Sequence, residues 1–153
     1  MKIGHSLGGA MGLFSGVKVL VRKSEAAVIV QKLLERQVAL GFLGADPAPS
    51  VLANKLVEVL WDRNPKIFNS GTLPHKLSVA AAALSSGVNA MARAGNREAM
   101  LAMLTSLGTV LMELIATGNR LSLHATDLYL IDQAEAVHRH FSEDGGTEFL
   151  HGG

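Results

Sequence analysis

The chain has 153 residues, of which 48% are hydrophobic, 18% are charged and 5% are aromatic, and its formal net charge is +1. This length and composition fit one folded domain and exclude an intrinsically disordered chain. The absence of cysteine excludes disulfides, thiolate metal sites and cysteine nucleophiles. Because aromatic residues are scarce, a core of Leu, Val, Ala and Met favours close-packed helices over an aromatic-rich β-sandwich.

The charges are unevenly distributed along the chain. Residues 1–76 hold ten Lys or Arg and five Asp or Glu, whereas residues 77–153 hold four and eight, so the two halves carry +5 and −4. Such halves can attract each other within one monomer or simply reflect solvated faces. They are also compatible with head-to-tail self-association, or with a polyanionic partner for the N-terminal half.

The first sixteen residues contain five glycines, a density that leaves the backbone too unrestrained for a stable helix. These residues are Gly4, Gly8, Gly9, Gly12 and Gly16. We therefore predict a glycine-rich arm over residues 1–23, a helical bundle over residues 24–144 and a flexible tail over residues 145–153.

The sequence indicates neither a signal peptide nor a membrane-spanning segment. His5, Lys18 and the glycines interrupt anything that resembles the apolar core of a signal peptide. The longest uncharged runs, Leu77 to Ala92 and Ala99 to Met112, are shorter than the roughly 20 apolar residues that a bilayer crossing needs. We therefore expect a cytoplasmic protein without a membrane partner.

The first helix of the predicted bundle starts at Ser24, a residue suited to an N-cap, and runs to about Leu43. It ends near Gly41 and Gly44, because glycine adopts the left-handed conformation that closes many helices.

A second helix is predicted after Pro47 and Pro49, which break the chain. Ser50 is its expected N-cap, and its apolar positions recur at helical spacing. Pro65 stops it after Asn64, because the residue before a proline disfavours the helical conformation.

Residues 61–76 form the longest internal stretch without periodicity and are the best candidate for a binding loop. Alternatively, the apolar residues of this stretch, Trp61 and Phe68 among them, cover the end of the bundle. The predicted binding residues combine this loop with the basic N-terminal segment: Lys18, Arg22, Lys23, Trp61, Arg63, Asn64, Phe68, Asn69 and His75.

A tight helical hairpin is predicted from residues 74–94 and 97–117, with Gly95 as the stop of its first helix and Asn96 as the N-cap of its second. Small residues recur at steps of three and four in each helix, at Ala80, Ala83, Gly87, Ala90 and Ala94, and at Ala99, Ala102, Ser106 and Thr109. We expect these two small seams to face each other, so that bulkier stripes pack on the remaining helices. A ligand or partner groove lined with methionine is the alternative.

The last helix is predicted after Gly118, with Ser122 or Thr126 as its cap, and ends at Gly145 and Gly146. Its apolar face carries Leu123, Leu130, Ala134, Val137 and Phe141. Pairs such as His124 with Asp127 are three residues apart, as metal ligands on one helical face would be. We interpret them as a solvated face and predict no metal site.

The segment Gly4-His5-Ser6-Leu7-Gly8 resembles the nucleophile elbow of lipases in the α/β-hydrolase fold. In that family the serine that matches Ser6 is the nucleophile, held on a turn between a buried strand and a helix. Only Met1, Lys2 and Ile3 precede the segment, and no run of buried strands follows it. The resemblance covers about seven residues and depends on a structural context that the rest of the sequence does not predict.

The sequence thus predicts an all-α, single-domain bundle of about five helices. We expect a non-enzymatic module for protein–protein interaction that self-associates, with no catalytic residue, metal or cofactor. Two alternatives remain open. One is a serine esterase that uses Ser6, and the other is a nucleic-acid-associated regulator that uses the basic N-terminal half, including Lys18, Arg22, Lys23, Lys32 and Arg36.

Overall fold

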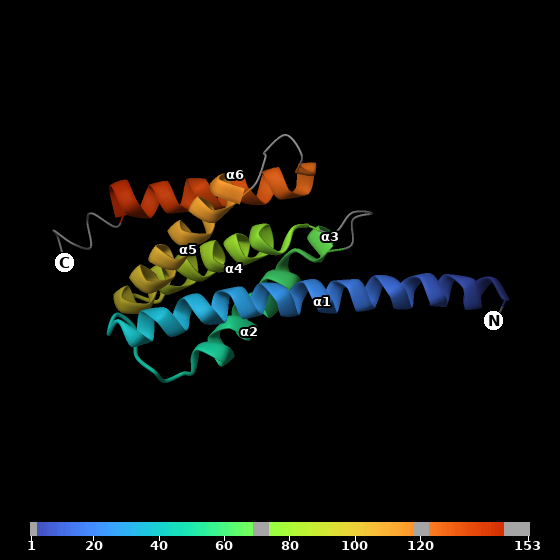
Figure 1. Ribbon diagram of the computed structural model, residues 1–153, viewed down its shortest axis with the longest axis horizontal. Helices are drawn as coiled ribbons and strands as arrows, with labels where there is room; N and C mark the ends of the chain where they lie inside the picture. Colours follow the sequence, from blue (N-terminus) through green and yellow to red (C-terminus); the bar gives the residue numbers. More distant parts are fainter. Residues whose placement is uncertain (1–2, 69–73, 118–122, 146–153) are drawn as a thin grey trace.

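The computed structural model describes residues 3–68, 74–117 and 123–145. They form a bundle of α-helices (Figure 1), which confirms the all-α prediction, and this part of the chain contains no strand. The elements are α1 (Ile3–Ala39), α2 (Pro49–Arg63), α3 (Pro65–Phe68), α4 (Lys76–Arg93), α5 (Arg97–Thr117) and α6 (Ala125–Arg139), followed by a π-helical turn, η2 (His140–Gly145).

Helix α4 is the centre of the bundle. It contacts α1, α2, α5 and α6, and Figure 1 shows it between α1 on one side and α6 on the other. A helix with neighbours all around must be apolar all around. The run of α4 residues from Leu77 to Ser85 is buried accordingly.

The predicted hairpin turn between α4 and α5 is confirmed in detail. Gly95 has a φ of +72°, and its N–H donates to the Ala92 carbonyl at 3.1 Å, while Asn96 N–H donates to the Met91 carbonyl at 2.9 Å. The side-chain oxygen of Asn96 then accepts from Ala99 N–H at 3.1 Å. One dipeptide therefore closes α4 and caps α5.

Replacing Gly95 by alanine should lower the free energy of unfolding by about 1 kcal/mol, because an alanine Cβ is strained at this positive φ. Gly44→Ala is the matched control. Gly44 has no positive φ, and a Cβ there would lie 3.7 Å from Glu98 Oε1, an ordinary contact. Urea unfolding followed by circular dichroism measures both variants, and an equal loss in the two would contradict this role for Gly95.

Helix α1 ends at Ala39, before the predicted Leu43 but next to the predicted Gly41, and it begins earlier than predicted. Gly41 has a φ of +83°, and Phe42 N–H donates to the Gln37 carbonyl at 2.9 Å, so the helix closes with the same motif as α4. The predicted start at Ser24 is not a boundary, because Ser24 lies within a helix that begins at Ile3. The backbone of residues 3–23 therefore belongs to α1 and extends past the other helices (Figure 1).

Two other predicted helix starts differ from the structure. Helix α2 has Ala48 as its N-cap and Pro49 in its first turn, and the expected cap Ser50 instead accepts from Asn54 Nδ2 through its carbonyl at 2.8 Å. His124 occupies the N-cap position of α6 without a side-chain hydrogen bond to the helix. Thr126 is therefore inside the helix, whereas the other expected cap, Ser122, lies outside the described residues.

The small seam of α4 does not face only small residues of α5. A Cβ on Gly87 would lie 2.7 Å from Met103 Sδ and 2.9 Å from Leu56 Cδ2. Gly87 therefore makes room for large side chains of α5 and α2, because helices interlock by placing large residues against small ones. The expectation that the two small seams meet is wrong at this position.

Residues 97–116 of helix α5 are long and apolar enough to cross a membrane by length and composition alone. However, 56% of this apolar stretch is buried inside the bundle. Burial of this kind is typical of a core helix in a bundle, which meets the same criteria.

Candidate functional site

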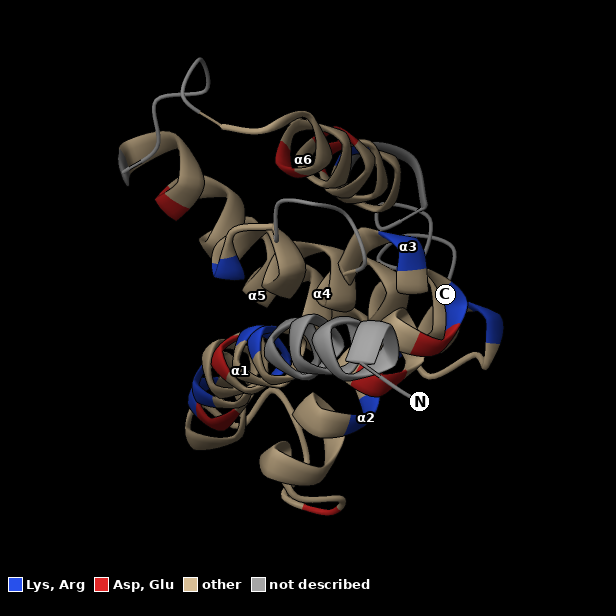
Figure 2. Ribbon diagram, turned by 90° about the vertical axis from the view of Figure 1, so that its right-hand side faces the viewer, with Lys and Arg blue, Asp and Glu red and all other residues tan. Residues whose placement is uncertain are grey.

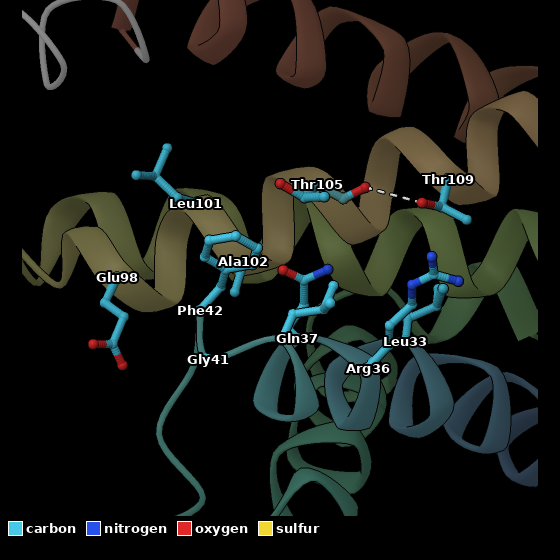
Figure 3. Close-up of a pocket in the computed structure, with 11 residues that line it drawn as sticks. Leu33, Arg36, Gln37, Gly41, Phe42, Glu98, Leu101, Ala102, Thr105 and Thr109 are labelled. Carbon is cyan, nitrogen blue, oxygen red and sulfur yellow. Dashed lines mark hydrogen bonds between the residues drawn. The ribbon is translucent and has the colours of Figure 1, made fainter.

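The C-terminal part of α1, the turn after it and α5 enclose a groove with a volume of about 710 Å³ (Figure 3). We call it the α1–α5 groove. Its apolar walls are formed by Leu33, Leu40, Phe42, Leu101 and Ala102. A cleft of this size with mainly apolar walls is typical of sites for organic ligands.

Polar side chains occupy defined places in the α1–α5 groove. Figure 3 shows Arg36 and Glu98 toward opposite ends, with Gln37 between them. Glu98 Oε1 accepts from Gly44 N–H at 3.0 Å, so this carboxylate holds the chain after α1. Arg36 forms no ion pair within the described part of the chain, and the groove is therefore cationic at one end and anionic at the other.

The turn at Gly41 places Phe42 beside the groove. Because α1 closes at this glycine, Phe42 lines the groove instead of continuing the helix. Phe42 remains exposed, as does Leu40. Large apolar side chains at the edge of a cavity provide contact surface for a ligand.

A second feature is an exposed apolar face on α1. Val17, Leu20, Val21 and Val28 are between 49% and 62% exposed. The opposite face of the helix is buried against its neighbours through Val19, Ala26, Val30 and Leu34. Figure 2, which looks along α1, shows the helix at the edge of the bundle. We call the four exposed residues the outer face of α1.

The structure brings three of the predicted binding residues together. Lys23 Nζ lies 5.2 Å from the centroid of the Trp61 ring and 2.6 Å from Glu58 Oε1. The Trp61 and Phe68 rings meet edge to face at 5.1 Å. Phe68 is only 1% exposed, so this cluster attaches α1, α2 and α3 to one another. The alternative in which these residues cover the end of the bundle accounts for their positions.

The remaining predicted residues are spread over several elements. Lys18 is exposed on α1, and Arg22 Nη1 pairs with Glu25 Oε1 at 2.8 Å. Arg63 and Asn64, at the end of α2, line a smaller cavity of about 230 Å³ between α2, α4 and α6. His75 caps α4, its Nδ1 accepting from Leu77 N–H at 3.1 Å. Asn69 lies outside the described residues, as does most of the predicted tail, residues 146–153.

Sequence reasoning did not identify the α1–α5 groove. The one sequence feature that could have indicated the groove is Gln37, a polar amide on the helical face that includes Leu33 and Leu40. The buried carboxylate of Asp127 was also missed. It is 2% exposed and accepts from His75 N–H at 2.6 Å, whereas the sequence suggested a solvated face.

Two features that the sequence offered for chemistry can be placed on the described part of the chain. Ser6 lies within α1, which begins at Ile3, whereas a nucleophile elbow requires a strand-to-helix turn. His, Asp and Glu side chains form no group of three that could hold a metal ion in the ranges that the structure covers.

These observations come from the chain alone. No protein-family model, curated protein or solved structure matches it.

Proposed function

We propose that this protein is a non-enzymatic helical interaction module that self-associates through the outer face of α1. The carrying observation is that large apolar residues are exposed on a helix whose other side is already packed against its own bundle. Contiguous apolar patches on a folded protein are typical of interaction surfaces.

The spacing of the outer face favours another helix as the partner. Three of its residues, Val17, Val21 and Val28, and the exposed Ser24 follow one another at steps of four, three and four. We call these four positions the seam. This seven-residue period keeps a seam facing a partner helix in a coiled coil. The next two positions at the same spacing are Gln31 and Glu35, which are polar, and Gln31 Nε2 donates to Glu35 Oε2 at 3.2 Å. The apolar face therefore ends before Gln31.

The charges beside the seam favour a second copy of this chain. Lys18 and Glu25 each follow a seam residue directly and are opposite in sign. An antiparallel copy related by a two-fold axis places Val17 opposite Val28, with Lys18 of each helix near Glu25 of the other. The same surface then complements itself, as a symmetric dimer requires.

Val21→Lys tests the proposal, because it places a charge in the seam without disturbing a buried site. We expect light scattering to show a dimer for the unmodified chain and a monomer for Val21→Lys, with association weakened by more than about tenfold. Val51→Lys is the matched control, since Val51 is a valine of similar exposure on α2. This variant should remain a dimer.

A charge swap tests the antiparallel arrangement. Lys18→Glu should weaken the dimer, and the double variant Lys18→Glu with Glu25→Lys should restore part of the lost affinity. The opposite charges then face each other again, although Glu25→Lys also removes the ion pair between Glu25 and Arg22. A monomeric unmodified chain would refute self-association. A dimer that Val21→Lys leaves unchanged would place the interface elsewhere.

A further inference from the structure

The α1–α5 groove is lined by a mostly buried glutamine whose side chain has no partner among the described residues. Gln37 is 6% exposed as a whole residue, and its side-chain amide forms no hydrogen bond within the described part of the chain. Figure 3 shows this amide directed from α1 toward α5, into the groove. The side-chain atoms that are fully shielded from solvent without a partner belong to Arg22 and Ser78. The Gln37 amide instead remains accessible from the groove, where it can hydrogen-bond to a ligand or to water.

Arg36 supplies a positive charge beside this amide. It comes from the same turn of α1, lines the same groove and has no carboxylate partner in the described residues. A guanidinium and an amide N–H together favour a carboxylate, which accepts charge-assisted hydrogen bonds from both. The geometry therefore distinguishes this end of the groove as an anion-binding end.

The rest of the groove disfavours a second negative charge. Its walls are Leu33, Leu101 and Phe42, which suit a hydrocarbon body. Toward the far end, Glu98 is held in place by Gly44 N–H and repels anions. We propose that the α1–α5 groove binds a small organic monocarboxylate, with its carboxylate on Arg36 and Gln37 and its hydrocarbon body between α1 and α5.

Decanoate is the probe that tests this site, titrated below its micelle concentration into the full ¹⁵N-labelled chain. We expect saturable shifts of the Gln37 side-chain amide and of the Leu101 backbone N–H. Decanol has the same hydrocarbon body without the charge, and decanedioate must bury a second charge. Both should bind at least about tenfold more weakly than decanoate, decanol because it loses a charge-assisted hydrogen bond and decanedioate because its second carboxylate is desolvated.

Substitutions then assign the two polar contacts. Arg36→Gln should weaken decanoate binding by about tenfold, because it removes the guanidinium charge that attracts the carboxylate. Since Arg36 is exposed, this substitution should leave the fold intact. The matched control is Lys32→Gln, which removes the same charge from α1 one turn earlier, outside the groove, and should leave binding unchanged. Gln37→Leu should also weaken binding while thermal unfolding shows a folded chain.

Three results would overturn the assignment. They are decanol binding as tightly as decanoate, full decanoate affinity of the Arg36→Gln variant, and shifts confined to the outer face of α1. The same titration on Val21→Lys keeps this site separate from self-association. Decanoate binding should persist there, because Val21 does not line the groove.

Discussion

Replacing Phe68 by alanine is expected to lower the free energy of unfolding by about 3 to 5 kcal/mol, the range for truncating a fully buried phenylalanine. Phe68 is 1% exposed, and its ring contacts Trp61 edge to face. Alanine would leave a cavity beneath α3 and remove the ring contact that orients Trp61. Urea unfolding followed by circular dichroism gives the free energy.

Phe42→Ala is the matched control for this prediction. Phe42 is 62% exposed, so its truncation should change the free energy of unfolding by less than about 1 kcal/mol. Equal losses in the two variants would contradict a core role for Phe68. Near-native stability of Phe68→Ala would do so as well, and would return this residue to the predicted binding surface.

Asp127→Ala is expected to cost about 1.5 to 3 kcal/mol, the contribution of a hydrogen bond to a charged group. The Asp127 carboxylate is 2% exposed and accepts from His75 N–H at 2.6 Å. It therefore connects the first turn of α6 to the residue that caps α4. Removing it leaves a backbone N–H without its acceptor at the joint between two helices.

Asp127→Asn separates the hydrogen bond from the charge. The amide oxygen still accepts from His75 N–H, so Asp127→Asn should lose less than half of the free energy of unfolding that Asp127→Ala loses. The residual loss, about 0.3 to 1 kcal/mol, corresponds to the negative charge at the positive end of the α6 dipole. If thermal unfolding shows the alanine variant to be as stable as the unmodified chain, this connection does not stabilise the fold.

Part of the candidate site was predictable from sequence, and part was not. The closure of α1 at Gly41 follows from local chemistry, because glycine accepts a positive φ at little cost. The groove beyond that turn depends on how far α5 stands from α1, and no residue spacing reports that distance. Gln37 is consequently read as one more position of a helix until the structure places its amide against a cavity.

The burial of an apolar residue, Phe68, and of a charged residue, Asp127, could not be predicted from sequence. Phe68 lies in a stretch without periodicity, so the sequence did not distinguish a binding loop from a cover over the core. Asp127 has the composition of a surface residue, yet the approach of α6 to His75 buries it. Burial is a property of neighbouring elements, whereas sequence patterns report only which residues share a face.

The sequence by itself determined the all-α class, the central hairpin and the turn at Gly95 and Asn96, because helical periodicity and capping act over a few adjacent residues. Only the tertiary structure decided that Gly87 receives Met103 and Leu56, that one apolar face of α1 stays uncovered, and that a groove opens beside α5. These features arise where separate helices meet, and the distances and angles between helices are set by the packing of all their side chains together.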